Sequence, residues 1–145
     1  MGDAGFVVIG AKEIEAALRE IGTVRVDAAE RRILTQGAAL IEKAAKANFE
    51  GSHKRGEPHV GGDKPNVVTG TLRRSIYHTP IAGTPGNRSV QVGPRVVYAR
   101  AIEWGNPRNN SRPLPYFEPA VQQVTPAIGE MAAREWAAAL SGGGA

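Results

Sequence analysis

The hydrophobic pattern of the first fifty residues predicts a short strand and two helices. Residues 6–9 form an apolar, β-branched run closed by a glycine, which is typical of a strand. From residue 11 the period changes, since Ile14, Leu18 and Ile21 fall on one face of a helix. The strongest pattern covers residues 27–51, where apolar side chains recur at spacings of three and four. It predicts an amphipathic helix of about six turns.

Two details refine the prediction for this long helix. Asp27 and Glu30 have the spacing of a capping box, in which each side chain satisfies a free backbone N–H at the start of a helix. Many positions of the helix are alanine, and small side chains allow close packing. We therefore expect the helix to begin at Asp27 and to pack closely against a neighbouring element.

A long loop follows at residues 51–68. The segment holds four glycines and two prolines and shows no hydrophobic period. Loops of this length are uncommon inside compact domains, and they are often functional or disordered in the free protein. We expect an exposed, mobile segment.

A short helix and a hairpin are predicted next. Residues 69–76 suit one helical turn capped by Thr69 or Thr71. Residues 75–93 contain two β-branched runs on either side of a glycine- and proline-rich turn at residues 82–87. This arrangement is typical of an antiparallel hairpin.

Residues 96–104 carry a mixed signal. Two adjacent valines suit a strand, whereas Tyr98 and Ile102 stand four apart and suit a helical turn that ends at Gly105. We favour a strand followed by a turn of helix. A loop rich in proline and asparagine then extends over residues 105–115.

The last predicted element is a helix that begins near Tyr116. Pro119 falls in its first turn, where a missing N–H costs little, and Pro126 falls inside the pattern and should kink it. Residues 141–145 read as a flexible tail. The predicted fold class is α+β: residues 1–145 form one domain, in which a small antiparallel sheet packs against a long helix from the N-terminal half and a long, kinked C-terminal helix.

The composition limits the core and the chemistry. Of the 145 residues 41% are hydrophobic but only 6% aromatic, so alanine, valine, isoleucine and leucine must fill most of the core. Cysteine is absent, which excludes disulfides, thiolate metal sites and cysteine nucleophiles. No apolar run approaches the ~20 residues that span a bilayer, and the first residues lack signal-peptide features. We expect a protein made in the cytoplasm and used or assembled there.

The net charge of +4 is unevenly placed. Residues 51–115 carry ten basic and three acidic side chains, whereas the segments before and after are slightly acidic. Such a patch favours nucleic acid or an acidic protein surface, although a solvated basic face is the more common meaning of such a pattern. The candidate basic docking residues are Lys54, Arg55, Lys64, Arg73 and Arg74.

No set of side chains suggests catalysis. His53 and His59 share the long loop without any zinc-binding spacing, and His78 lies in a predicted strand. A proline follows Lys64, which does not suit a phosphate-binding loop. Glu103 and Glu118 could pair as acid and base, but structural roles explain both. We predict a protein that is not an enzyme and has no catalytic residues, cofactor or metal site.

Three motifs, in this order along the chain, resemble those of one protein family. They are V-T-G-T-L-R-R-S-I at residues 68–76, V-G-P at 92–94 with Y-A at 98–99 and I-E-W-G at 102–105, and R-P at 112–113 with P-Y-F-E-P-A at 115–120. The family is the tail-component family of long-tailed bacteriophages, typified by gene product ten of the HK-ninety-seven-like phages. The sequence departs from the family pattern at Arg100 and Asn106, which leaves the contacts with neighbours open.

The resemblance implies a structural protein of the virion that is assembled in the host cytoplasm. Its expected place is the head–tail junction, as a ring-forming tail-completion, tail-terminator or neck subunit that joins the tail to the head connector. Its expected partners are copies of itself and the neighbouring neck, stopper and tail-tube proteins, with DNA passing through the channel as a non-specific partner and no membrane contact. The alternative function is a basic nucleic-acid-binding module.

Large side chains near the proline-rich loop are candidates for the assembly interface, because such groups are costly to expose. The alternative is that they cap the core. Together with two residues of the family motifs, the candidate interface consists of Tyr98, Glu103, Trp104, Leu114, Tyr116 and Phe117.

Overall fold

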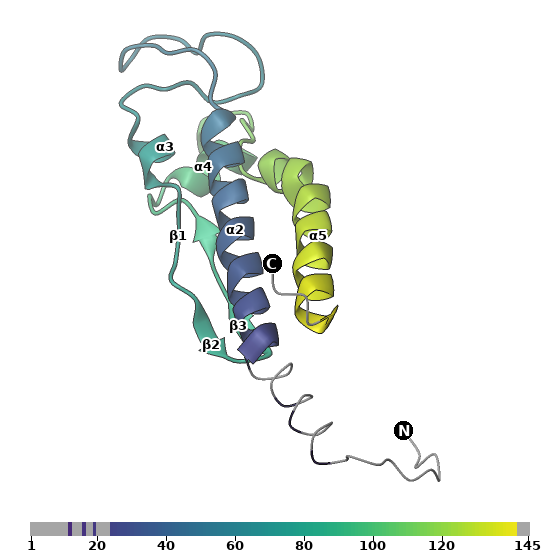
Figure 1. Ribbon diagram of the computed structural model, residues 1–145. Helices are drawn as coiled ribbons and strands as arrows, with labels where there is room; N and C mark the ends of the chain where they lie inside the picture. Colours follow the sequence, from purple (N-terminus) through teal and green to yellow (C-terminus); the bar gives the residue numbers. More distant parts are fainter. Residues whose placement is uncertain (1–11, 13–15, 17–18, 20–23, 142–145) are drawn as a thin grey trace.

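The computed structural model describes residues 12, 16, 19 and 24–141, and two long antiparallel helices dominate it (Figure 1). They are α2, Val26–Ala47, and α5, Glu118–Ser141. Near one end of the pair, Arg32 Nε donates to a carboxylate oxygen of Glu135 at 2.6 Å. Near the other end, the Asn48 side chain donates to the Tyr116 carbonyl at 3.0 Å. The predicted strand at residues 6–9, most of the helix that follows it and residues 142–145 lie outside the described part.

Small residues bring α2 and α5 close together. The buried residues of α2 are Ala29, Gly37, Ala38 and Ala45, all of them small. At Gly37 an added Cβ would lie 3.5 Å from the Ile128 side chain of α5. The expectation of close packing through alanine is confirmed.

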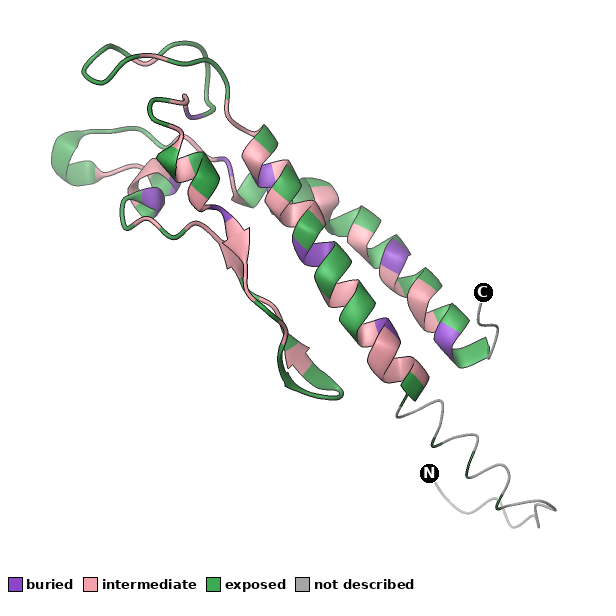
Figure 2. Cartoon of the chain, turned by 60° about the vertical axis from the view of Figure 1, so that its left-hand side comes forward, coloured by how far each residue is buried: buried purple, intermediate pink, exposed green. Residues whose placement is uncertain are grey.

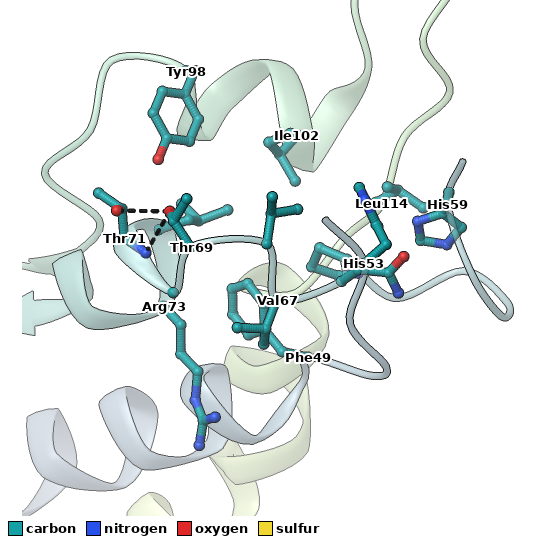
Figure 3. A pocket seen from close by; sticks show the side chains of 15 residues that line it. Phe49, His53, His59, Val67, Thr69, Thr71, Arg73, Tyr98, Ile102 and Leu114 are labelled. Carbon is teal, nitrogen blue, oxygen red and sulfur yellow. Dashed lines mark hydrogen bonds between the residues drawn. The ribbon is translucent and has the colours of Figure 1, made fainter. Parts of the chain in front are cut away.

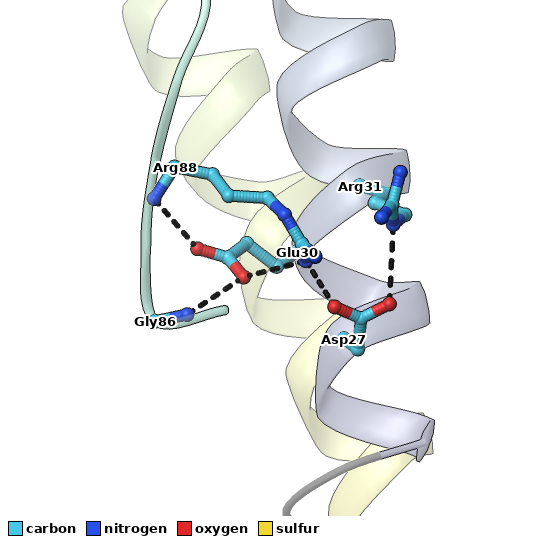
Figure 4. Close-up of polar contacts among 5 residues, drawn as sticks. All are labelled: Asp27, Glu30, Arg31, Gly86 and Arg88. Carbon is cyan, nitrogen blue, oxygen red and sulfur yellow. Dashed lines mark hydrogen bonds and ion pairs between the residues drawn. The ribbon is translucent and has the colours of Figure 1, made fainter. Parts of the chain in front are cut away.

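The start of α2 differs from the predicted capping box. The helix begins at Val26, and its N-cap residue, Arg25, makes no side-chain capping bond. Asp27 and Glu30 instead bind Arg88, whose side chain is only 6% exposed (Figure 4). The predicted capping box was wrong because Arg88, 61 residues after Asp27, offers both carboxylates a stronger, charge-assisted partner.

The backbone of the hairpin also contributes to this cluster, which we call the Arg88 clamp. Glu30 accepts the N–H groups of Gly86, at 3.0 Å, and Arg88, at 3.3 Å. The hydrogen bond from Arg88 lowers the pKa of Asp27, and the hydrogen bond from the Gly86 N–H lowers the pKa of Glu30. The clamp fastens the tip of the hairpin to α2.

Four short strands form one interrupted hairpin after a five-residue helix, α3, Thr71–Ser75. β1, Tyr77–His78, pairs antiparallel with β4, Val92–Gly93, and β2, Ala82–Thr84, pairs antiparallel with β3, Asn87–Ser89. Between the two ladders, one side of the hairpin has three residues, 79–81, and the other has two, 90–91. This mismatch is typical of a β-bulge. Pro80 lies in this interruption, where its missing N–H removes no ladder bond.

The hairpin is therefore confirmed, but its turn is shorter than predicted. Residues 82–84 and 87–89 are strands, and only residues 85–86 form the turn. The predicted cap of α3 is also changed: the N-cap position is Gly70, at φ +76°, and Thr69 Oγ1 accepts the Thr71 N–H at 3.3 Å.

The segment after the hairpin is helical. The strand favoured at residues 96–98 is wrong, because these residues turn directly into α4, Ala99–Trp104, with Ala99 N–H donating to the Val96 carbonyl at 3.2 Å. The helix ends at Gly105 as predicted, at φ +76°. A 3₁₀ turn, η2, Pro107–Asn109, interrupts the following loop.

The first turns of α5 bend away from the rest of the helix (Figure 1), consistent with the kink predicted at Pro126. The hairpin lies along one side of α2 and α5 along the other. The α+β class and the arrangement of the two long helices are confirmed.

The best-packed part of the core lies where the C-terminal end of α2 meets α3, α4 and the start of α5. Its buried residues are Ala45, Ile76, Tyr116 and Ala120. The ring centroids of Phe49 and Tyr116 lie 5.2 Å apart. Exposed residues gather on the long loop and the hairpin tip (Figure 2). Small aliphatic residues thus fill most of the core, as the composition required.

Candidate assembly surface

The short helix α4 separates two hollows on the surface of the subunit. Tyr98, which precedes the helix, and Ile102 line a pocket under the long loop. Ala99, Arg100 and Trp104 line a larger groove on the other side. The i, i+4 spacing of a helix places each set on its own face. Four of the six candidate interface residues, Glu103, Trp104, Tyr116 and Phe117, line the groove.

The floor of the groove is made by an unusual helix cap. Glu103 is only 6% exposed, and its carboxylate accepts the backbone N–H groups of Tyr116, Phe117 and Glu118 at 2.9, 3.0 and 2.9 Å. These groups lie at the start of α5, where N–H donors have no partner within the helix. A carboxylate there also interacts favourably with the helix dipole. Glu103 therefore fixes the angle between α4 and α5.

Tyr116 lies beside this cap and is 1% exposed. Burial, reinforced by the nearby Glu103 charge, raises the pKa of the Tyr116 hydroxyl, so it stays neutral. Both residues are thus part of the interior of the subunit. The burial of Tyr116 agrees with the alternative that this side chain caps the core.

The groove itself is open and mostly apolar. It has a volume of about 730 Å³, and its apolar walls come from both sides of the α4–α5 corner: Pro94, Val96, Val97, Trp104, Phe117 and Val121. Val97 is 98% exposed and Trp104 59% exposed. The Arg100 guanidinium lies 5.2 Å from the Trp104 ring centroid and covers part of that ring. Two large apolar side chains therefore face solvent within one hollow.

The pocket under the loop is smaller and tighter, with a volume of about 160 Å³ (Figure 3). Its lining includes Phe49, Val67, Ile102 and Leu114, with His53 and His59 contributed by the loop. Each histidine ring is within hydrogen-bond distance of a loop carbonyl: 2.8 Å for His53 and 3.0 Å for His59. The two histidines therefore have local structural partners.

The loop at residues 51–68 is exposed along most of its length but tied at its base. The Asn66 side chain donates to the Glu50 carbonyl at 2.5 Å and to the Val60 carbonyl at 2.7 Å, and it accepts the Val60 N–H at 2.8 Å. Arg112 binds Asp63 at 3.0 Å. The prediction of a long, exposed loop is confirmed, and whether it moves stays a prediction.

The basic docking residues are all exposed and divide between two elements. Lys54, Arg55 and Lys64 lie on the loop, and Arg73 and Arg74 lie on α3. The structure places Arg73 at a hollow that it shares with Lys43 and Lys46 of α2.

This basic hollow contains one carboxylate. Glu42 accepts from Lys46 Nζ at 2.5 Å and lies 2.6 Å from His78 Nδ1, and the Lys46 hydrogen bond lowers the pKa of Glu42. His78, predicted to lie in a strand, is in β1 and lies half-buried against α2.

Sequence reasoning missed three features of this surface. It gave Arg88 no role, assigned Val97 to a strand, and did not find the Asn66 tie. One feature of the sequence could have indicated the capping role of Glu103. The residues just before α5 are Pro, Tyr and Phe, and none of these can cap a helix with its own side chain. Free N–H groups there implied a partner from elsewhere in the chain.

Two general statements hold for the described residues. Among residues 24–141 and the three described before them, no group of three His, Asp or Glu side chains is placed to hold a metal ion. None of the helices in this part of the chain is long and apolar enough to cross a membrane.

Comparison with known proteins identifies one family. The profile described as "Bacteriophage HK97-gp10, putative tail-component" matches residues 12–105, which extend from before α2 through α4 to the glycine that ends it. Neither the curated proteins nor the solved structures gave a match to the chain. Since the profile covers well over half of the sequence, the chain belongs to the HK97-gp10 family of bacteriophage tail components.

Proposed function

We propose that this tail component works at the phage head–tail junction, as a ring-forming tail-completion, tail-terminator or neck subunit that joins the tail to the head connector. The observation that carries the proposal is the exposed apolar groove at the α4–α5 corner, with Val97 98% and Trp104 59% exposed. Exposed apolar surface gathered in one hollow is typical of an interaction site. Burying such side chains in an interface stabilises it by about 1.5–3 kcal/mol each.

The unlike surfaces of the subunit suit a ring. A closed ring of identical subunits needs heterologous contacts, in which two different surfaces of each copy meet. The apolar groove beside α4 differs from the other surfaces of the subunit, which include the loop-covered pocket and the end that carries the start of α2. The Glu103 cap fixes the α4–α5 corner beside the groove, and Asn66 ties the base of the loop beside the pocket. The neighbouring neck, stopper and tail-tube proteins are the partners we propose beyond the ring.

We propose further that the protein has no catalytic activity and needs no cofactor. Glu103 was considered together with Glu118 for acid–base chemistry, and its two carboxylate oxygens already accept three backbone N–H groups. A carboxylate committed in this way serves the fold. The groove around it offers apolar side chains, which suit contact with another protein surface.

Electron microscopy of the purified protein, alone and mixed with tail tubes, tests the proposal. We expect rings, or rings that cap tail tubes. The variant Val97→Asp should lose assembly while keeping its thermal stability, because the side chain is almost fully exposed. Ala133→Asp, at an exposed position of α5, is the matched control. Persistent monomers that never bind tail or neck proteins would contradict the proposal.

A nucleic-acid-binding module is the second candidate. It is favoured by the basic hollow, where Arg73 of α3 joins Lys43 and Lys46 of α2 near the basic loop. Such binding should weaken steeply as salt rises, because each phosphate contact releases counterions. Neutralising Lys54, Arg55 and Lys64 together should reduce both DNA affinity and its salt dependence. Undetectable DNA binding at low salt would remove this candidate.

A further inference from the structure

We propose that, in the ring, the groove beside α4 is filled by the apolar segment at residues 6–9 of a neighbouring copy. The inference rests on the proposed ring and names the contact that closes it. Three observations support it: the chemistry of the groove, the sequence of the segment, and the distance between the start of α2 and the groove.

The groove calls for an apolar occupant. Its one buried carboxylate, Glu103, is saturated by backbone donors, and no buried side-chain N or O atom in the described part of the chain lacks a hydrogen-bond partner. Val97 and Trp104 offer apolar contact instead. A volume of about 730 Å³ exceeds what one side chain would fill and suits a short peptide segment.

The segment at residues 6–9 has the matching chemistry. Its sequence, Phe-Val-Val-Ile, is the longest uninterrupted run of large apolar residues in the chain, and glycines flank it on both sides. In an extended segment alternate side chains point the same way. Two large apolar side chains could therefore enter the groove together, with the glycines allowing the backbone to turn in and out.

The position of α2 favours a neighbouring copy as the donor. The segment precedes the N-terminal end of α2 in the sequence, whereas α4 lies towards the C-terminal end of that helix (Figure 1). The groove, which α4 lines, is therefore at the end opposite the start of α2. A helix of 22 residues is about 33 Å long, so the segment would have to return along the whole of α2 to reach its own groove. In a head-to-tail ring, the end of one copy that carries the start of α2 meets the α4 end of the next.

Exposed apolar residues at both ends support a head-to-tail contact. Val24, just before α2, is 63% exposed, and Leu140, near the end of α5, is 60% exposed. They lie at the end of the subunit that carries the start of α2. Val97 and Trp104 are exposed apolar residues at the other end, where they line the groove. Joining the two ends buries both sets in one heterologous interface.

Cysteine cross-linking tests the contact directly, because the chain contains no cysteine. The variants Val8→Cys and Val97→Cys are mixed in equal amounts and oxidised gently. A disulfide requires the two Cβ atoms to approach within about 3.5–4.5 Å. We expect a disulfide-linked dimer of the two variants, and no such dimer when Ala133→Cys replaces Val97→Cys.

A single chain carrying both Val8→Cys and Val97→Cys decides which copy supplies the segment. Contact between copies gives a ladder of covalent oligomers on a denaturing gel. A monomer closed by an internal disulfide overturns the inference, as does the absence of any cross-link. Rings seen by microscopy without the cross-link would overturn the inference and leave the proposed function standing. The absence of rings and cross-links would contradict both.

Discussion

Replacing Glu103 by glutamine removes one negative charge and one acceptor from the interior without changing the size of the side chain. The carboxylate holds the first three N–H groups at the start of α5, with Oε2 accepting from Tyr116 and Phe117 and Oε1 from Glu118. Glutamine keeps one carbonyl oxygen and can preserve the paired contact. Its NH₂ group would then face the Glu118 N–H, donor against donor.

The size of the effect follows from these contacts. A buried donor left without a partner costs about 1–3 kcal/mol. Loss of the negative charge at the helix N-terminus costs a further ~0.3–1 kcal/mol, and up to about 2 kcal/mol in a partly buried site. The expected loss is about 2–4 kcal/mol, a large share of the 5–15 kcal/mol typical of a domain. For a chain of this length, Tm should fall by roughly 5–15 °C.

Urea unfolding followed by circular dichroism measures the change. Glu130→Gln is the matched control, since Glu130 is exposed on the same helix and surface substitutions usually stay within about 0.5 kcal/mol. Native far-UV spectra of both variants must agree with the parent before unfolding. If Glu103→Gln unfolds at the same urea concentration as Glu130→Gln, the carboxylate does not hold α5 in the way described.

Three further predictions concern other contacts. Arg88 lowers the pKa of Asp27, and the hairpin N–H groups together with Arg88 lower the pKa of Glu30. The two carboxylates therefore stabilise the folded state above pH ~4, and this stabilisation is lost as the pH falls through their lowered pKa values. Arg88→Met should therefore be less stable at pH 7, and its deficit should narrow below pH ~4 in urea titrations; a deficit that does not change with pH would contradict the clamp. Gly37→Ala should stabilise the helix pair by up to about 1 kcal/mol, because the new Cβ meets α5 at an ordinary contact distance of 3.5 Å. Gly37→Leu should destabilise the pair. Thermal melts in which the leucine variant is the more stable of the two would refute the packing. Gly105→Ala should cost about 1–2 kcal/mol or more in chemical denaturation, because φ is +76° and the new Cβ would lie 2.7 Å from a carbonyl oxygen, and a neutral result would contradict this geometry.

Local sequence patterns were sufficient where neighbours in the chain decide the structure. The 3.6-residue period predicted α2 and α5, Gly105 marked the end of α4, and a glycine- and proline-rich stretch marked the hairpin turn. Regular backbone hydrogen bonds and apolar periodicity are properties of consecutive residues, so they can be read directly. The strand predicted at residues 96–98 failed because two valines suit several conformations, and the start of α4 decided between them.

Contacts between distant parts of the chain could not be predicted in the same way. Asp27 and Glu30 have the spacing of a capping box, yet the folded chain brings them to Arg88, on a strand 58 to 61 residues away. Glu103 looked like a residue before a helix stop, and packing of α4 against α5 made it the cap of the last helix. In each case the charged side chain follows the stronger partner that tertiary packing supplies.

The sequence by itself determined the class of fold, the two long helices, the long basic loop and, through its motifs, membership of the phage tail-component family. Only the tertiary structure decided which of the candidate interface residues face solvent. Tyr116 and Glu103 are buried at the α4–α5 corner, whereas Trp104 and the unpredicted Val97 remain exposed in the groove. Exposure depends on which elements cover a side chain, and that covering is set by contacts between residues far apart in the chain.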